Sequence, residues 1–183
     1  MVLVAAIAAG VLINTAGLLQ SQAEATGEES SEQVTDRVVV STVTGVVDDA
    51  DDGIETVNLT VQRSPGAGDI NLNDSIVEVF SNGTSSTMTT DNGNFEPPGE
   101  TPDVPDDEEF AIDKIQGDDT ATLSDSSDRA LIIVPLSEMD DEGDAKLKPG
   151  QSVSITITTA AGGSAFVEKR APSSLDDDST VRL

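Results

Sequence analysis

The sequence predicts an α+β fold in which one long N-terminal apolar helix is followed by an antiparallel β-sandwich domain. Residues 1–19 carry no charge, β-branched apolar runs recur after residue 37, and the runs are separated by turns rich in glycine, proline and asparagine, with no second helical pattern. We expect two parts: residues 1–36 form the helix and an acidic neck, and residues 37–183 form the β domain. With 183 residues, 36% of them hydrophobic, the chain can build one β-rich core beside the helix.

The N-terminal segment reads MVLVAAIAAGVLINTAGLL, and its only polar side chains are those of Asn14 and Thr15. As an α-helix it spans roughly 29 Å, about the hydrocarbon thickness of a bilayer. Alanine and glycine fill seven of its positions, which favours close packing against other helices, although an ordinary membrane span is the alternative. Gly10 and Gly17 each cost ~1 kcal/mol of helix propensity, which indicates a need for close contact or bending. Past Leu19 the apolar surface narrows to a stripe, so the helix is expected to emerge into water.

The segment 27–36, GEESSEQVTD, can continue the helix and is expected to end it near Thr35 or Asp36. Residues 37–47 are rich in β-branched side chains and precede an acidic turn at 48–53, which predicts a strand and a turn. Residues 56–62 alternate apolar with polar side chains, which predicts a second strand. We expect the two strands to form a hairpin. Further strands are expected at residues 76–80, 85–90, 110–115, 130–134, 153–158 and 165–170.

Two tight turns connect neighbouring strands in this prediction: Asn82-Gly83 after the third strand, and the Gly-rich stretch at 161–163 before the last. Residues 91–109 hold four prolines and many acidic side chains, so they cannot bury enough surface to offset their ordering entropy and are expected to form a long exposed loop. Six to nine short strands with such turns are typical of an immunoglobulin-like sandwich.

The net charge is strongly negative: 35 acidic against 9 basic residues give −26 and a pI near 4.1. This charge disfavours nucleic acid as a partner, and equally the anionic face of a membrane. Near 1 M salt the screening length falls to about 3 Å, which relieves the self-repulsion, so we infer a salt-adapted, haloarchaeal source. Disorder is the competing explanation of the acidity, but the β-branched apolar runs restrict it to local segments.

The chain contains no cysteine and no histidine, so disulfides, thiolate nucleophiles, the commonest zinc ligands and the usual general base are all missing. Without a nucleophile elbow or phosphate loop either, we expect no enzyme activity, no catalytic residue and no cofactor. The acidic clusters at 48–52 and at Asp140, Asp141, Glu142 and Asp144 offer oxygen ligands for cations, but neither has EF-hand spacing, and a solvated acidic surface explains them better. We therefore assign no metal site.

Three N-x-[ST] sequons begin at Asn58, Asn73 and Asn82, and none has proline in the middle. All three are acceptors of N-linked glycans if the chain is exported, although chance matches to this pattern are common. We expect the three asparagines on exposed strand ends or loops.

The run VAAIAAGVLINTAGLLQ, followed by a Gln-rich, Ala-Thr-Gly-Glu segment and a valine strand, resembles the start of mature haloarchaeal archaellins, the archaeal flagellins. The resemblance covers about the first 47 residues, and the remainder only in general type. It implies a precursor with a basic leader cut by a prepilin-type peptidase, transient membrane insertion, and assembly into a homopolymer whose core is built from N-terminal helices, with the β domain as outer sheath. The core residues so implied are Val4, Ala5, Ile7, Ala8, Ala9, Val11, Leu12, Ala16 and Leu19.

The start of the chain departs from that family, because the leader, the processing site and the apolar residues that precede this methionine in relatives are absent. We expect that an internal methionine was taken as the start or that the form is truncated. The resulting hypothesis is a structural subunit of the extracellular archaeal flagellum that serves swimming. A type IV pilin-like adhesive fibre subunit and a membrane-anchored surface binding protein are the alternatives.

Overall fold

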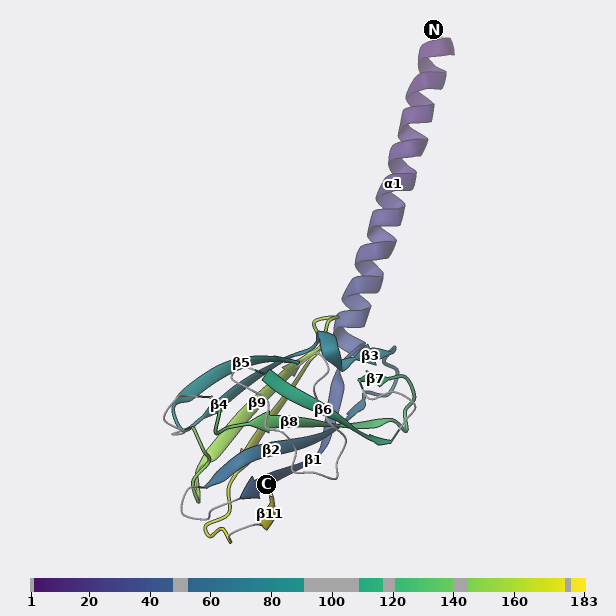
Figure 1. Cartoon of the computed structure of the whole chain (residues 1–183). Coiled ribbons are helices and arrows are strands. Elements are labelled where there is room, and N and C mark those ends of the chain that lie inside the picture. The colour runs from purple at the N-terminus through teal and green to yellow at the C-terminus, as the bar shows by residue number, and fades with distance from the viewer. Residues whose placement is uncertain (1, 48–52, 91–108, 117–120, 140–144, 177–178) are drawn as a thin grey trace.

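The computed structural model describes residues 2–47, 53–90, 109–116, 121–139, 145–176 and 179–183. One helix, α1 (Val2–Thr35), projects as a single rod from a β domain (Figure 1). The apolar segment and the acidic neck are therefore one continuous helix, and it ends where the sequence predicted, at Thr35.

The β domain contains all eight predicted strands and three shorter ones, β3, β7 and β11, that periodicity did not predict. The short 3₁₀ helix η1 (Leu72–Asp74) follows β3. The strands are β1 (Val38–Val47), β2 (Ile54–Arg63), β3 (Ile70–Asn71), β4 (Ile76–Ser81), β5 (Thr84–Thr90), β6 (Glu109–Gln116), β7 (Thr122–Leu123), β8 (Arg129–Pro135), β9 (Ser152–Thr158), β10 (Ser164–Arg170) and β11 (Ser179–Arg182).

Nine of these strands form one hydrogen-bonded sheet in the order β10-β9-β4-β5-β6-β8-β2-β1-β11, and β3 pairs with β7 separately. All pairs are antiparallel except β5 with β6, which run parallel through Thr89 opposite Glu109 and Thr90 opposite Phe110. The sheet folds over at this parallel pair, so that β10-β9-β4-β5 forms one layer and β6-β8-β2-β1-β11 the other around a common core. The two-layer architecture expected from the sequence is present, and the parallel junction is an addition to it.

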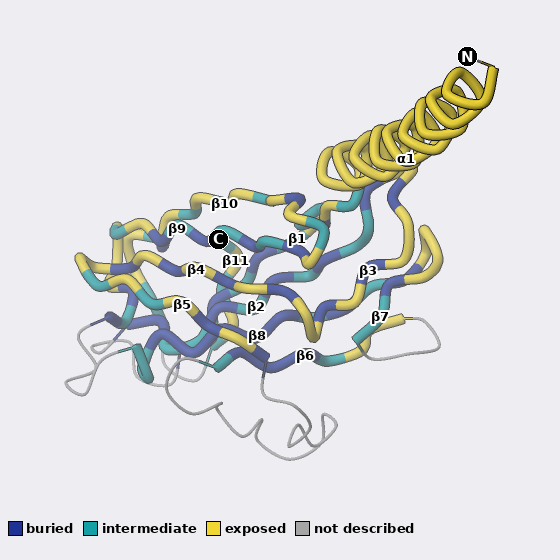
Figure 2. Tube along the Cα trace, turned by 90° about the horizontal axis from the view of Figure 1, so that it is seen from above, coloured by how far each residue is buried: buried dark blue, intermediate teal, exposed yellow. Residues whose placement is uncertain are grey.

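Alternation of buried and exposed residues along the strands builds the core (Figure 2). In β9 the side chains of Val153, Ile155 and Ile157 point inward, and each is only 1% exposed. Burial of each such aliphatic side chain contributes about 1.5–3 kcal/mol. Phe110 is fully buried at the start of β6, beside the parallel junction. The domain therefore has a core of its own that does not involve α1.

The turn predicted at Asn82-Gly83 joins β4 to β5, and both residues have positive φ, 48° and 91°, as a two-residue hairpin turn requires. Gly162, at φ 83°, turns β9 into β10 as expected. Of the segment 91–109 only Glu109 is described, where it begins β6, and the rest of that predicted loop lies outside the described residues. The acidic clusters at 48–52 and 140–144 also lie outside them.

Candidate functional site: an uncovered apolar helix

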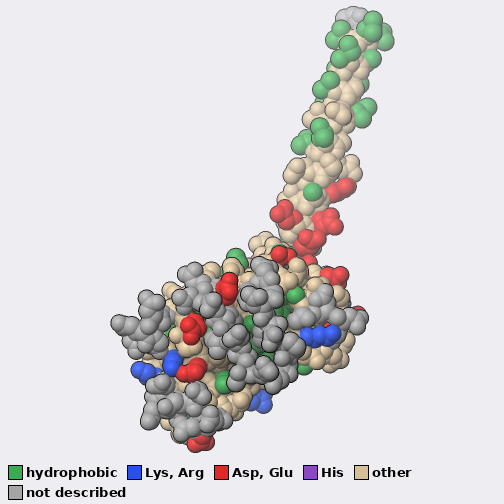
Figure 3. Space-filling view, in the orientation of Figure 1, with side chains coloured by type: hydrophobic (Ala, Val, Ile, Leu, Met, Phe, Trp, Pro, Cys, Tyr) green, Lys and Arg blue, Asp and Glu red, His purple; other side chains and the backbone are tan. Residues whose placement is uncertain are grey.

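Every described residue of α1 up to Thr35 is exposed, and none is buried against the β domain. Nine large aliphatic side chains in the first nineteen residues are more than half exposed, for example Val4 at 72% and Leu12 at 70%. Figure 3 shows hydrophobic side chains along the outer part of the helix and acidic ones where it meets the β domain. An apolar surface of this size is unfavourable in water and needs lipid or protein to cover it.

The helix is long and apolar enough to cross a membrane, as judged by length and composition. The Thr15 hydroxyl suits such surroundings, because it donates to the carbonyl oxygen of Val11 at 2.8 Å and is thus satisfied within the helix. Polar side chains begin at Gln20, whose amide donates to the carboxylate of Glu24 at 3.0 Å. The surface of α1 therefore suits an apolar environment up to about residue 19 and an aqueous one from residue 20 on.

Among the described residues, nothing packs against the three glycines of α1. A Cβ added at Gly10, Gly17 or Gly27 would meet no other atom within 4 Å. Since glycine costs a helix about 1 kcal/mol relative to alanine, its presence at Gly10 and Gly17 suits close approach of a backbone from outside the chain. The packing of another helix against these glycines stays a prediction.

The nine residues predicted to pack in a filament core are all found on the apolar part of α1. They are distributed around the helix, because its small and large apolar residues occupy every face, and none of them contacts the β domain. They are Val4, Ala5, Ile7, Ala8, Ala9, Val11, Leu12, Ala16 and Leu19. Their packing against other copies is a prediction.

The helix is joined to the β domain by fixed hydrogen bonds at Asp36. Its side-chain Oδ1 accepts from the backbone N–H of Gly68 at 2.9 Å, and its carbonyl oxygen accepts from the hydroxyl of Thr159 at 2.7 Å. The carbonyl oxygen of Arg37 accepts a hydrogen bond from the backbone N–H of Ser64 at 2.9 Å. A Cβ on Gly163 would lie 2.5 Å from the Asp36 carbonyl oxygen, so glycine is needed for this approach.

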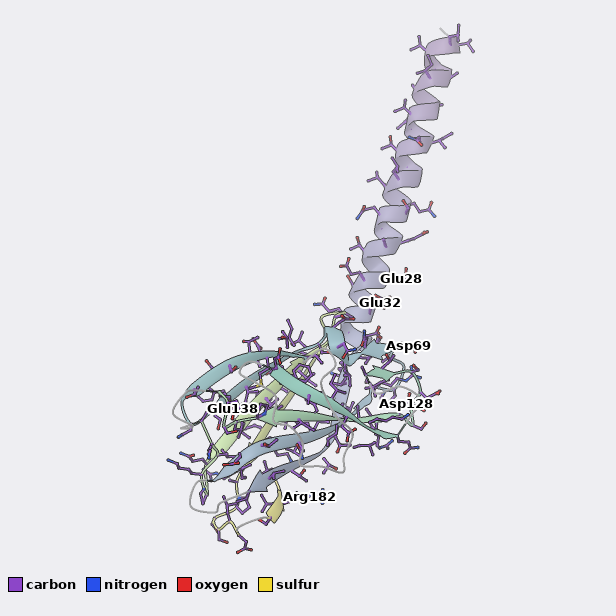
Figure 4. The ribbon with its side chains drawn as sticks, viewed as in Figure 1. Glu28, Glu32, Asp69, Asp128, Glu138 and Arg182 are labelled. Atoms are coloured by element: carbon purple, nitrogen blue, oxygen red, sulfur yellow. The ribbon has the colours of Figure 1, made fainter. Side chains whose placement is uncertain are left out.

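Sequence reasoning placed the boundary at Asp36 but missed its partners. The hydrogen bond from Thr159 to Asp36 joins residues 123 positions apart. A local sequence pattern cannot predict a contact between residues so distant in the chain. Figure 4 shows Glu28 and Glu32 near the domain end of α1 and Asp69 beside the place where the helix enters. A hollow of about 40 Å³ lies here between Asp36, Asp69 and Thr159, which is room for water rather than for a ligand.

The sequons differ in their structural settings. Asn73 lies in η1 and Asn82 in the β4–β5 turn, and both are exposed as expected. The expectation is wrong for Asn58, which lies in the middle of β2, opposite Thr44 on one side and Ile133 on the other. Its side-chain oxygen is buried and has no hydrogen-bond partner. The alternation of residues 56–62 already placed Asn58 inside a strand, and that signal should have outweighed the sequon.

Within the residues that the structure describes, no group of three or more histidine, cysteine, aspartate or glutamate side chains is arranged to hold a metal ion. The two ion pairs given by the described residues join side chains of the β domain. Lys146 Nζ lies 2.6 Å from Glu55 Oε1, and Arg63 Nη1 lies 3.9 Å from Asp69 Oδ1. Most of the exposed large hydrophobic side chains among the described residues belong to α1.

The family model for archaeal-type flagellin matches residues 1–183. Flagellin B2 of Halobacterium salinarum is 41% identical over the whole chain and 88% of that flagellin's own length. Flagellin B1 of Natrialba magadii is 39% identical over the whole chain and 89% of its own length.

Two solved structures share the fold at 15% identity. The archaeal flagellum of Methanospirillum hungatei has a TM-score of 0.71, with 100% of this chain and 92% of the other covered. The crystal structure of flagellin FlaB1 from Methanocaldococcus jannaschii has a TM-score of 0.67, with 81% and 96% covered. From the uncovered N-terminal helix to the last strand, the chain belongs to the archaeal-type flagellin family.

Proposed function

We propose that this chain is a structural subunit of the archaellum, the archaeal flagellum at the cell surface, and that it serves swimming motility rather than catalysis. Its α1 helices pack together in the filament core, and its β domain faces the medium. The observation that supports this proposal best is the apolar surface of α1, which lies uncovered. The helix itself is hydrogen-bonded to the folded β domain at Asp36. Membership of the flagellin family and the likeness to a flagellum structure support it.

Before assembly the same helix is held in a membrane, where lipid tails cover its aliphatic side chains. On assembly neighbouring helices replace the tails. Association of helices that leave lipid depends on close packing, to which Gly10 and Gly17 contribute by admitting a neighbouring backbone. The acidic neck at the base of α1 remains in water in both states.

Gene deletion in the source organism tests this function. We expect the deletion strain to lose filaments in negative-stain microscopy and to lose spreading on soft agar, and we expect the full-length gene to restore both. Fibres that persist as adhesins without any effect on swimming would instead support the pilin-like alternative. A chain found only in the membrane fraction, with no fibres, would support the membrane-anchored binding protein.

We also propose that Asn73 and Asn82 carry N-linked glycans in native filaments, since both are exposed in non-strand positions. Asn58 should be unmodified in the folded chain, because a glycan there would separate β2 from its neighbours. Mass spectrometry of peptides from native filaments provides the measurement, and Asn73→Gln and Asn82→Gln should each remove one modified peptide. Finding both asparagines unmodified would contradict the proposal.

A further inference from the structure

The layer β10-β9-β4-β5 has an outward face that we call the hydroxyl face, because serine and threonine predominate on it. The β domain, over its described residues, leaves four large hydrophobic side chains exposed, and three of them lie on this face: Ile76 at 43%, Phe80 at 52% and Phe166 at 66%. The fourth, Ile115, lies in β6 of the other layer. Exposed aromatic and aliphatic side chains gathered on one side of a domain mark an interaction surface.

The strand register places the two phenylalanines on opposite sides of β9, offset by two residues along it. Phe166 lies opposite Thr156 of β9, and Phe80 lies opposite Ser154, two residues earlier in the same strand. The two rings thus flank β9 on a diagonal, within reach of one partner surface. The outward position between Phe80 and Ile76 is occupied by Glu78.

The face is nearly neutral in a chain of net charge −26. Besides its three hydrophobic side chains and its hydroxyls it presents Glu78, Glu168 and Arg170, which sum to −1. Identical acidic copies repel one another, so they can approach closely only where their own surface carries little charge. The hydroxyl face meets that condition.

The opposite layer, as far as its residues are described, exposes only Ile115 among its large hydrophobic side chains. Leu131 and Ile133 of β8 point away from the core, because they alternate with Ile132 and Val134, which belong to it. Yet Ile133 is only 5% exposed and Leu131 is half-buried. The hydroxyl face is therefore the side of the β domain on which exposed hydrophobic residues gather.

We propose that the hydroxyl face is a contact surface for the β domain of a second copy of this chain within the filament. The inference rests on the proposed function. The face is continuous with the base of the helix, because the β9–β10 turn that borders it holds Asp36 through Thr159. Copies whose helices pack side by side must bring neighbouring β domains together near this turn.

The size of the face explains why the helix is also needed. Four strands about 4.8 Å apart and six residues long cover roughly 400 Å². A stable pair of proteins buries about 800 Å² on each partner. The contact is thus too small to hold two β domains together in solution, and it acts once helix packing has placed the copies side by side.

The test compares Phe166→Glu with Ile115→Glu, a matched change at a side chain of similar exposure outside the face. Both are made in the full chain, and their β signals by circular dichroism are compared with that of the wild type. We expect Phe166→Glu to raise the subunit concentration needed for filament reassembly by roughly tenfold or more, because it places a third carboxylate beside Glu78 and Glu168. Ile115→Glu should reassemble like the wild type, and equal behaviour of both variants would overturn the proposal.

The absence of cysteine permits a second measurement that does not depend on blocking assembly. Phe166→Cys and Ile115→Cys are each labelled with a maleimide as dissociated subunits and as filaments. We expect labelling of the residue at 166 to slow by roughly tenfold in filaments and that at 115 to be unchanged. Equal protection at both sites, or none at 166, would refute this contact while leaving the filament function intact. Failure of the wild type to form filaments would instead refute the proposed function.

Discussion

Ala8→Asp is expected to abolish filaments while leaving the β domain folded. Ala8 lies in the apolar part of α1, fully exposed in the single chain and thus available to neighbours. In a filament core the new carboxylate would be dry and without a partner, at a cost of several kcal/mol in every subunit along the polymer. The β domain lies beyond Asp36 and has its own core, so its circular dichroism should not change.

Ala25→Asp is the matched control for this variant. It introduces the same charge on the same helix, but past Leu19, among side chains that are already polar. We expect filaments of normal appearance by negative-stain microscopy with Ala25→Asp and none with Ala8→Asp. A fragment of residues 37–183 should be soluble, folded and monomeric, because the hydroxyl face is too small to hold a pair. Polymerisation of that fragment, or normal filaments of Ala8→Asp, would show that the helix does not drive assembly.

The parts of the fold that local chemistry determines could be predicted from the sequence. The uncharged N-terminal run specifies α1, and alternation such as Val153, Ile155 and Ile157 specifies a strand with one buried face. Asn82-Gly83 specifies its turn because both residues tolerate positive φ. The apolar surface of α1 was also predictable, because the sequence places apolar residues on every face of the helix between residues 2 and 19.

The parts that depend on distant residues could not be predicted. The parallel pairing of β5 with β6 joins strands separated by residues 91–108, and nothing in either strand marks a parallel partner. β3 and β7, of two residues each, are too short to show any period. The hydrogen bond from Thr159 to Asp36 and the placement of Phe80 and Phe166 on either side of β9 both follow from the strand order. The joint and the hydroxyl face therefore required the structure.

Lowering the salt concentration is expected to unfold the β domain. The chain carries 35 acidic and 9 basic residues, and the described ion pairs are few: Lys146 with Glu55, and the long exposed pair of Arg63 with Asp69. A surface pair of the latter kind is worth at most about 1 kcal/mol. The screening length grows from about 3 Å at 1 M salt to about 10 Å at 0.1 M, so unpaired carboxylates come to repel one another across the surface as salt is removed.

Circular dichroism during stepwise dilution of sodium chloride measures this effect, and the β signal should be lost in a cooperative transition below a defined concentration. Neutralising Asp125→Asn and Glu138→Gln together should move that transition to lower salt, because each change removes one repelling charge without touching the core or either of these ion pairs. Sucrose stabilises proteins through exclusion rather than screening, so it should not replace the salt in the wild type. A β signal unchanged near zero salt would contradict the prediction. Equal rescue by sucrose would assign the effect to solvent exclusion, whereas rescue by salt alone identifies charge repulsion as the force that the fold must overcome.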